Sequence, residues 1–419
     1  MVPASYSPIM VRLALSKILW VALAAMFFQQ CFTILSQSVI PLIAPVALPV
    51  LDVPASYLGV FVSISAVAKT IVNIGCGNFI RRYGGIRISQ AGLVFVILAL
   101  LCAASGYVWP FLITAIAIAL GTAAGTPASS HILSRYAPPR YAPMIFSAKQ
   151  TSVPVGLAFG GLVVPYLVSL FGWQGALMAI ATMCLCFGLF LQTIRTEIDS
   201  DRIPDQKMSV NDFHITLLVV LRHRGLLRLS IVNLSFVGLQ ITYMTYMVLF
   251  LTNELNYSYA DAGIFYATAM MAAIPARVLW GYVATTRIGA GNVLAGLALG
   301  MAAASMATGM TTLEWPAWQI LSVSIILTST ALGWQGVLLS EVARLAPPGQ
   351  IGAATGGVLG FSSIGQILMP LAFSGMLMLT GEYRYGFMVV AIPALMVAVM
   401  LLLGGGVEGS NRKHRPTTN

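Results

Sequence analysis

Long apolar runs separated by short polar breaks follow one another along almost the whole chain. Twelve runs can be delimited, and most reach the roughly 20 apolar residues that a helix needs to cross the hydrocarbon core of a bilayer. The expected spans are residues 17–43, 56–80, 87–107, 110–134, 143–170, 174–195, 228–252, 259–283, 289–310, 316–342, 351–379 and 384–405. This pattern predicts an all-α polytopic membrane protein with twelve transmembrane helices.

One long polar stretch divides these runs into two sets of six. It covers residues 196–227 and carries acidic and basic residues together. We therefore expect an N-terminal six-helix bundle at 1–195, a cytoplasmic linker at 196–227, and a C-terminal six-helix bundle with a short cytoplasmic tail at 228–419.

The two halves also repeat one another in sequence. "SRYAPPRYAP" at 134–143 matches "ARLAPPGQIG" at 343–352, and Gln30 is matched by Gln240, 210 positions later. Structural repeats of this kind are typical of secondary transporters, whose two halves rock about a site near the bilayer midplane. The repeat therefore favours a transporter made of two pseudo-symmetric bundles over an enzyme embedded in the membrane.

Composition supports the membrane assignment. Hydrophobic residues make up 58% of the chain, charged residues 8%, and the mean hydropathy is +0.88. Ordinary soluble domains are about 25% charged, and no water-soluble core could bury this much apolar surface. The sequence has no Walker-type phosphate loop, no paired carboxylates within one span and no cluster of metal ligands. We expect no cofactor, no metal site and no enzymatic activity.

The net charge is +10, and the charged residues are distributed unequally between the two sides of the expected membrane topology. On one side of the membrane we place Arg12, Lys17, Arg81, Arg82, Arg87, Arg135, Arg140, the central linker, Arg287, Arg344, Arg412, Lys413 and Arg415. On the other side we place Asp52, Glu254, Asp261, Glu314 and Glu382, with Arg384 as the only base. Because Lys and Arg accumulate in cytoplasmic loops, both termini are predicted to be cytoplasmic. The expected location is a cell membrane, the inner membrane in a bacterium. The expected partner is lipid and not nucleic acid, and we expect a monomer.

At this point the sequence resembles the major facilitator superfamily over essentially its whole length. "GNFIRRYGG" (77–85) resembles the family's loop signature between spans two and three, with matches at Gly77, Arg82 and Gly84. The corresponding loop after span eight, "GYVATTRIGAG", keeps Arg287. The resemblance implies that these four residues belong to a cytoplasmic gate. Both loops lack the family's acid, which Arg81 replaces in the first, so the interaction of that acid is not carried over.

Arg277 is the most informative charge inside an expected span. An ionisable side chain at bilayer depth costs about 2.5–3.5 kcal/mol on insertion scales, so it faces a cavity, a partner or the interface. Arg277 shares a helix face with the small residues Ala273 and Gly281. This pattern is similar to span eight of the monocarboxylate transporters and oxalate/formate exchangers. The resemblance implies that Arg277 binds the carboxylate of the substrate. The alternatives are that Arg277 extends to the cytoplasmic interface or pairs with Glu341.

The other candidate site residues favour an anionic substrate. Lys69 lies on one polar face with Ser65 and Asn73, and Lys149 lies near the start of span five. The first six spans thus hold two candidate buried cations and no buried acid. Further substrate-binding candidates are Gln30, Asn73, Gln240, Tyr243 and Gln366, and each could instead bond a neighbouring helix. His131 and Glu341 are the candidates for proton coupling.

These features predict a secondary active transporter of a small organic anion of the carboxylate type. We expect proton-coupled symport first and anion exchange second. A drug or amphiphile efflux antiporter is an alternative carrier. From a different class, a membrane receptor that binds a ligand without transporting it is the other alternative.

Overall fold

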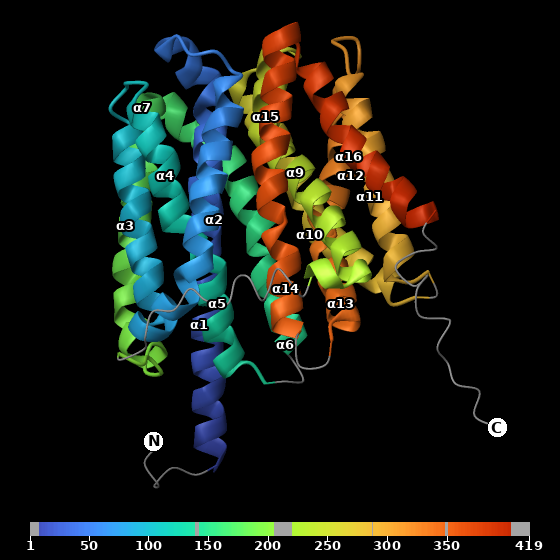
Figure 1. Ribbon diagram of the computed structural model, residues 1–419. Helices are drawn as coiled ribbons and strands as arrows, with labels where there is room; N and C mark the ends of the chain where they lie inside the picture. The colour runs from blue at the N-terminus through green and yellow to red at the C-terminus, as the bar shows by residue number, and fades with distance from the viewer. Residues whose placement is uncertain (1–7, 139–141, 205–219, 287, 348–350, 404–419) are drawn as a thin grey trace, which may run out of the picture.

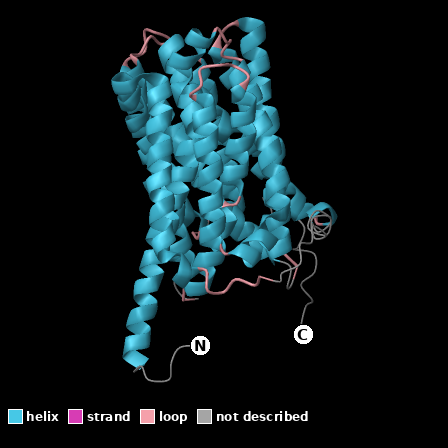
Figure 2. Cartoon of the chain, turned by 90° about the vertical axis from the view of Figure 1, so that its left-hand side faces the viewer, coloured by secondary structure: helices cyan, strands magenta, loops and turns pink. Residues whose placement is uncertain are grey.

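A bundle of long helices makes up the protein in the computed structural model, which describes residues 8–138, 142–204, 220–286, 288–347 and 351–403. No strand occurs within these ranges, and the helices run roughly along one axis in both views (Figures 1 and 2). The first half contains α1 (Pro8–Leu51), α2 (Tyr57–Tyr83), α3 (Gly85–Ala103), α4 (Pro110–Ala123), α5 (Gly125–Tyr136), α6 (Ala142–Gln150) and α7 (Ser152–Ile198). The second contains α9 (Arg224–Asn253), α10 (Tyr259–Ala284), α11 (Ala290–Gly309), α12 (Ala317–Gly333), α13 (Gln335–Leu345), α14 (Ile351–Gly360), α15 (Ser362–Thr380) and α16 (Tyr383–Leu403). The all-α prediction is confirmed.

Ten helical segments of the described chain are long and apolar enough to cross a membrane. The apolar part of α2, Tyr57–Asn73, is shorter. The longest segment, Met144–Ile198, has 55 residues, more than twice the length that a bilayer needs. Within it, Gly172 has φ 69° and ψ 173°, which ends one helix and starts another in the same run. A glycine tolerates this backbone because it has no Cβ. The count of twelve crossings stays a prediction.

Helix breaks recur at the same places in the two halves. Ala124 separates α4 from α5, and Trp334 separates α12 from α13, 210 residues later. Thr151 separates α6 from α7, and Phe361 separates α14 from α15, again 210 residues later. The helix breaks therefore repeat at the same spacing as the sequence motifs, which recur after 209 or 210 residues. The exact bundle and linker boundaries stay predictions.

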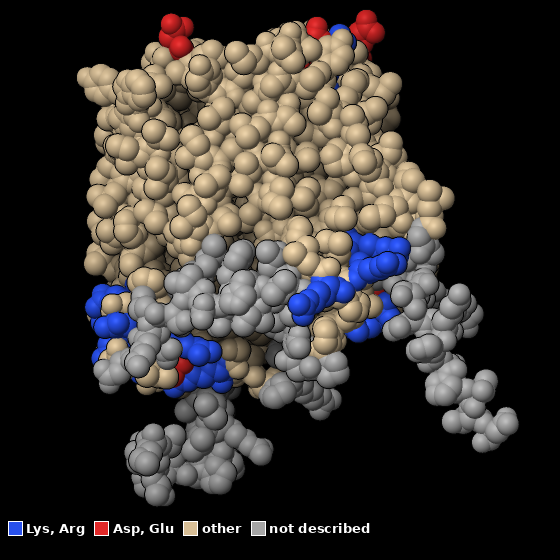
Figure 3. All heavy atoms as spheres, viewed as in Figure 1, with Lys and Arg blue, Asp and Glu red and all other residues tan. Residues whose placement is uncertain are grey.

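Charge separates along the axis of the bundle. Lys and Arg gather at the end where α1 begins, where a few acids such as Asp201 accompany them, and the opposite end shows mainly Asp and Glu (Figure 3). At the acidic end Glu382 pairs with Arg384, and the Glu254 carboxylate accepts the backbone N–H of Tyr383 at 3.0 Å. This asymmetry agrees with the sequence pattern, and assigning the basic end to the cytoplasm remains a prediction.

At the basic end, the Asp199 carboxylate caps the start of α3. It accepts the backbone N–H groups of Ile86 at 2.9 Å and Arg87 at 3.0 Å. Gly84 has φ +94°, and a Cβ there would overlap Asp199, so this position requires glycine for both reasons. Burial raises the pKa of Asp199, while the two backbone donors oppose that shift.

Contacts between the two halves include close glycine packing toward the acidic end. A Cβ at Gly263 of α10 would overlap the carbonyl oxygen of Gly161 in α7. A Cβ at Gly59 of α2 would overlap Ser374 of α15, whose hydroxyl also bonds the Tyr246 hydroxyl at 2.7 Å. Glycine has no side chain, so helices in membranes can approach one another closely where glycines meet. The two halves are therefore tightly joined near this end.

Candidate functional site

Two cations from opposite halves, the buried Lys149 and the half-buried Arg277, lie close together in the interior. Arg277 of α10 donates from Nη1 to the backbone carbonyl of Gln150 at 3.2 Å. Lys149, the neighbour of Gln150 in α6, donates from Nζ to Gln30 Oε1 at 3.0 Å. Arg277 also donates from Nη2 to Gln335 Oε1 at 3.3 Å. We call Arg277 and Lys149 the basic pair.

No carboxylate balances the basic pair within the described residues. Lys149 is only 2% exposed, yet its partners are neutral amides. Arg277 likewise donates to a carbonyl and an amide, and its buried Nε has no hydrogen-bond acceptor. No ion pair among the described residues includes Arg277 or Lys149. Two like charges without a counter-ion are costly in a desolvated site, so the arrangement is suited to an incoming anion.

The two proton-coupling candidates lie in ion pairs elsewhere. The Glu341 carboxylate binds Arg344 of the same helix, with Nε to Oε2 at 2.9 Å. His131 contacts the Asp201 carboxylate at 3.0 Å, and Arg135 binds the same carboxylate. The alternative that Arg277 pairs with Glu341 is therefore wrong, because Arg344 occupies that acid. Coupling roles for His131 and Glu341 stay predictions.

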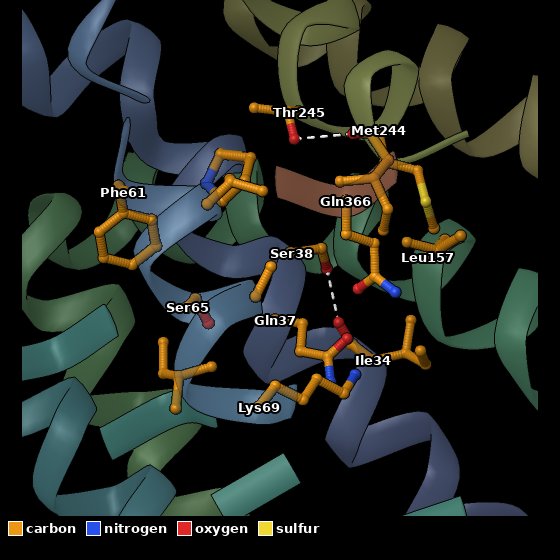
Figure 4. A pocket seen from close by; sticks show the side chains of 15 residues that line it. Ile34, Gln37, Ser38, Phe61, Ser65, Lys69, Leu157, Met244, Thr245 and Gln366 are labelled. Atoms are coloured by element: carbon orange, nitrogen blue, oxygen red, sulfur yellow. Dashed lines mark hydrogen bonds between the residues drawn. The ribbon is translucent and has the colours of Figure 1, made fainter. Parts of the chain in front are cut away.

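A pocket lies between α1, α2, α9 and α15 (Figure 4). Its cavity is small, about 80 Å³, compared with the roughly 300–1,000 Å³ of most small-molecule sites. Its lining comprises Ile34, Gln37, Ser38, Pro41, Phe61, Val62, Ser65, Ala66, Lys69, Ile118, Leu157, Ile241, Met244, Thr245 and Gln366. Most of this surface is apolar, with a few polar groups among it.

One face of α1 connects the pocket with the basic pair. Gln30 holds Lys149, and Ile34 and Gln37 line the pocket. Residues spaced by four and then three positions lie on the same side of a helix. At 1.5 Å per residue, Gln30 and Gln37 are about 10 Å apart along the axis. The basic pair and the pocket therefore lie along the same face of α1, about two turns apart.

The structure brings together only part of the predicted substrate-binding set. Arg277, Lys149 and Gln30 meet at the basic pair, and Lys69 and Gln366 line the pocket. These placements do not test binding, so the assignments stay predictions.

The remaining candidates neither line the pocket nor bond the basic pair. The Tyr243 hydroxyl bonds Ser324 at 2.8 Å within the second half. The Gln240 amide lies 3.9 Å from the Met244 sulfur, and Asn73 is exposed on α2, outside the pocket lining.

The predicted gate residues lie near the basic end. Gly77 and Arg82 are in α2, and the Arg82 guanidinium lies 5.5 Å from the centre of the Tyr83 ring. Gly84 forms the junction with α3, and Arg287 lies outside the described residues. A gating role for these residues stays a prediction.

Gln335 and Gln150 are site residues that the sequence analysis did not single out. Gln335 begins α13 directly after the break at Trp334, and Gln150 ends α6 just before the break at Thr151. Interrupted helices often place binding groups in transporter interiors. The motif "GWQG" at 333–336 was the available signal for Gln335.

Repeated helical halves with a polar site between them define a membrane transporter. The family model described as Major Facilitator Superfamily matches residues 26–356. The chain therefore belongs to the major facilitator superfamily, and this membership identifies it as a transporter rather than an enzyme.

Solved structures of the same fold include several transporters. A bacterial homologue of the human lysosomal transporter Spinster, inward-facing and occupied, is 15% identical with a TM-score of 0.72, covering 91% of this chain and 96% of that one. A peptide transporter POT in complex with sulfate is 15% identical with a TM-score of 0.74, covering 92% and 94%. A POT family transporter in complex with 5-aminolevulinic acid is 11% identical with a TM-score of 0.75, covering 91% and 95%. Identities this low establish the fold alone.

No curated protein sequence matches this chain significantly. The resemblance to monocarboxylate and oxalate/formate carriers stays untested.

Proposed function

We propose that the protein is a secondary active transporter of a small organic anion of the carboxylate type. The observation that supports this most is the basic pair, a buried lysine and a half-buried arginine whose partners in the described chain are all neutral. A cationic substrate would be repelled at this position, whereas an acid would supply the missing negative charge.

The chemistry of Arg277 fits a carboxylate. A guanidinium is planar and can present two parallel N–H donors to the two oxygens of a carboxylate. Its present acceptors, a backbone carbonyl and the Gln335 amide, are neutral and lie at 3.2 and 3.3 Å, longer than charge-assisted bonds. Exchanging them for a carboxylate strengthens each bond. Hydrogen bonds to charged groups contribute about 1.5–3 kcal/mol each.

The position of the basic pair connects binding with alternating access. Arg277 comes from the second half and Lys149 from the first, so an anion held by both joins the two halves across the site. In the present state the halves also meet through Gly161 and Gly263 toward the acidic end. Transport then requires that these contacts open while the bound anion is retained.

Proton-coupled symport is our first choice of coupling, with the proton carried by His131, Glu341 or the substrate acid itself. Anion exchange is the second choice. It is favoured by one specific observation, that His131 and Glu341 are both already in ion pairs. An exchanger needs no titrating group, because a second anion neutralises the basic pair on the return step.

Uptake into proteoliposomes tests the proposed function. We expect at least one labelled small acid to enter vesicles with wild-type protein, driven by an inward proton gradient for symport or by preloaded acid for exchange. Arg277→Gln should lower this uptake at least tenfold, consistent with the loss of one charge-assisted interaction of about 1.5–3 kcal/mol. Arg224→Gln, the same change at an exposed residue of α9, is the matched control. Transport of cationic dyes with no uptake of any acid would contradict the proposal and favour drug efflux.

A further inference from the structure

Lys69 is a third cation of the site, and the basic pair does not explain it. It lines the pocket from α2 and makes no hydrogen bond or ion pair with any residue that the structure describes. Figure 4 shows its side chain extended toward Gln37 of α1. A lysine in a membrane helix normally faces a cavity or a partner. Here it faces the cavity.

Two amide groups add hydrogen-bond donors beside Lys69. The Gln37 Nε2 atom is buried without an acceptor. Gln366, on the opposite wall from α15, directs its amide nitrogen only to the Ser362 hydroxyl, at a long 3.4 Å. A buried donor without an acceptor costs about 1–3 kcal/mol. The Lys69 ammonium and the Gln37 amide nitrogen therefore have no acceptor among the described residues, and the Gln366 amide nitrogen has only a long bond.

This group is separated from the basic pair by an apolar surface. Gln37 and Gln30 are about 10 Å apart along α1, and Ile34 lies between them with Leu157 on the facing wall. A ligand that satisfies both ends has an acid group at each end and an apolar chain between. With about 1.2 Å of length per backbone bond in an extended chain, this separation of roughly 10 Å corresponds to at most about eight bonds between the two carboxyl carbons.

The geometry points to Lys69, Gln37 and Gln366 as a second anion subsite, and to an α,ω-dicarboxylate as the substrate class. This inference rests on the proposed function, in which the basic pair binds the first carboxylate. It adds that a monocarboxylate fills only half of the site. Lys69 then sets specificity, because it distinguishes a second acid group from a methyl end.

The test compares uptake of α,ω-dicarboxylates of four to eight carbons with monocarboxylates of the same length, in proteoliposomes. We expect wild-type protein to prefer the dicarboxylates at least tenfold, with an optimum chain length. Lys69→Gln should lower dicarboxylate uptake at least tenfold more than monocarboxylate uptake and so remove this preference, and Lys69→Arg should keep it. Arg277→Gln should lower uptake of both series. The midpoint of thermal unfolding of each variant shows whether it is folded.

Two outcomes overturn the inference in distinguishable ways. If wild type carries both series equally and folded Lys69→Gln does the same, the second subsite does not exist and the proposed function stands. If wild type carries neither series, the proposed function fails and the inference fails with it. If Lys69→Gln does not fold, Gln37→Leu on the opposite side of the subsite gives the same comparison.

Discussion

The Gln30 amide orients Lys149 and leaves its positive charge available to an anion. Its Oε1 accepts Lys149 Nζ at 3.0 Å and the Thr126 hydroxyl at 3.2 Å, so it orients the lysine without neutralising it. A carboxylate in place of the amide would have the same shape and would form a buried ion pair with Lys149. The neutral acceptor therefore preserves the positive charge of the basic pair.

Gln30→Glu is predicted to inhibit the transporter without unfolding it. The new carboxylate competes with the substrate for Lys149, so the KM for anion uptake should rise about tenfold or more, as expected for loss of at least 1.4 kcal/mol. The midpoint of thermal unfolding without substrate should stay the same or rise. An unchanged KM would show that Lys149 does not take part in binding.

At the scale of an element, Asp199 holds the start of α3 against the end of α7. Its carboxylate accepts two backbone N–H groups, as the side chain of an N-terminal helix cap does. Such caps contribute about 0.5–2 kcal/mol. Burial raises the pKa of this carboxyl, while the two backbone donors and Arg195, 4.0 Å away, oppose that shift. We expect the acceptor oxygens to contribute more to this cap than the charge does.

Substitutions at this cap should separate the acceptor from the charge. Asp199→Ala should lower the free energy of unfolding by about 0.5–2 kcal/mol, whereas Asp199→Asn, which keeps one acceptor oxygen, should lower it by less. Gly84→Ala should be worse than either, because φ +94° is strained and a Cβ overlaps Asp199. Thermal unfolding in detergent measures all three. Equal loss in the Asn and Ala variants would mean that the charge matters most.

In the whole molecule, the close approach of Gly161 and Gly263 holds the two halves in contact toward the acidic end. Gly263→Val should prevent this approach and disfavour the state seen here, since its added carbon overlaps the Gly161 carbonyl. We expect uptake to fall at least tenfold while the two halves stay folded. Gly375→Val is the matched control, because nothing lies within 4 Å of a Cβ at that position. Equal uptake by the two variants would show that this contact does not limit transport.

The sequence predicted the large-scale features because they depend on local patterns. Apolar runs and the 210-residue repeat of Gln30 and Gln240 follow from composition and order, and they indicated a helical bundle with two related halves. Arg277, Lys149 and Lys69 were recognisable because charge is rare in such runs.

The partners of these charges were not predictable in the same way. Gln335 reaches Arg277 from a helix 58 residues later in sequence, and Asp199 caps a helix more than 100 residues earlier. Helix packing determines such contacts, and no periodicity within one span encodes it. For the same reason, the sequence left both Arg277 and Arg344 open as partners of Glu341, and the structure pairs it with Arg344, one turn away on the same helix.

The central claim is that the basic pair binds the negative charge of the substrate. Calorimetric titration of a transported acid into purified protein tests it most directly, with wild type, Arg277→Gln and the Arg224→Gln control compared at one pH. The account predicts an affinity at least tenfold weaker in folded Arg277→Gln and unchanged in Arg224→Gln. An Arg277→Gln protein that binds the acid as tightly as wild type would contradict it.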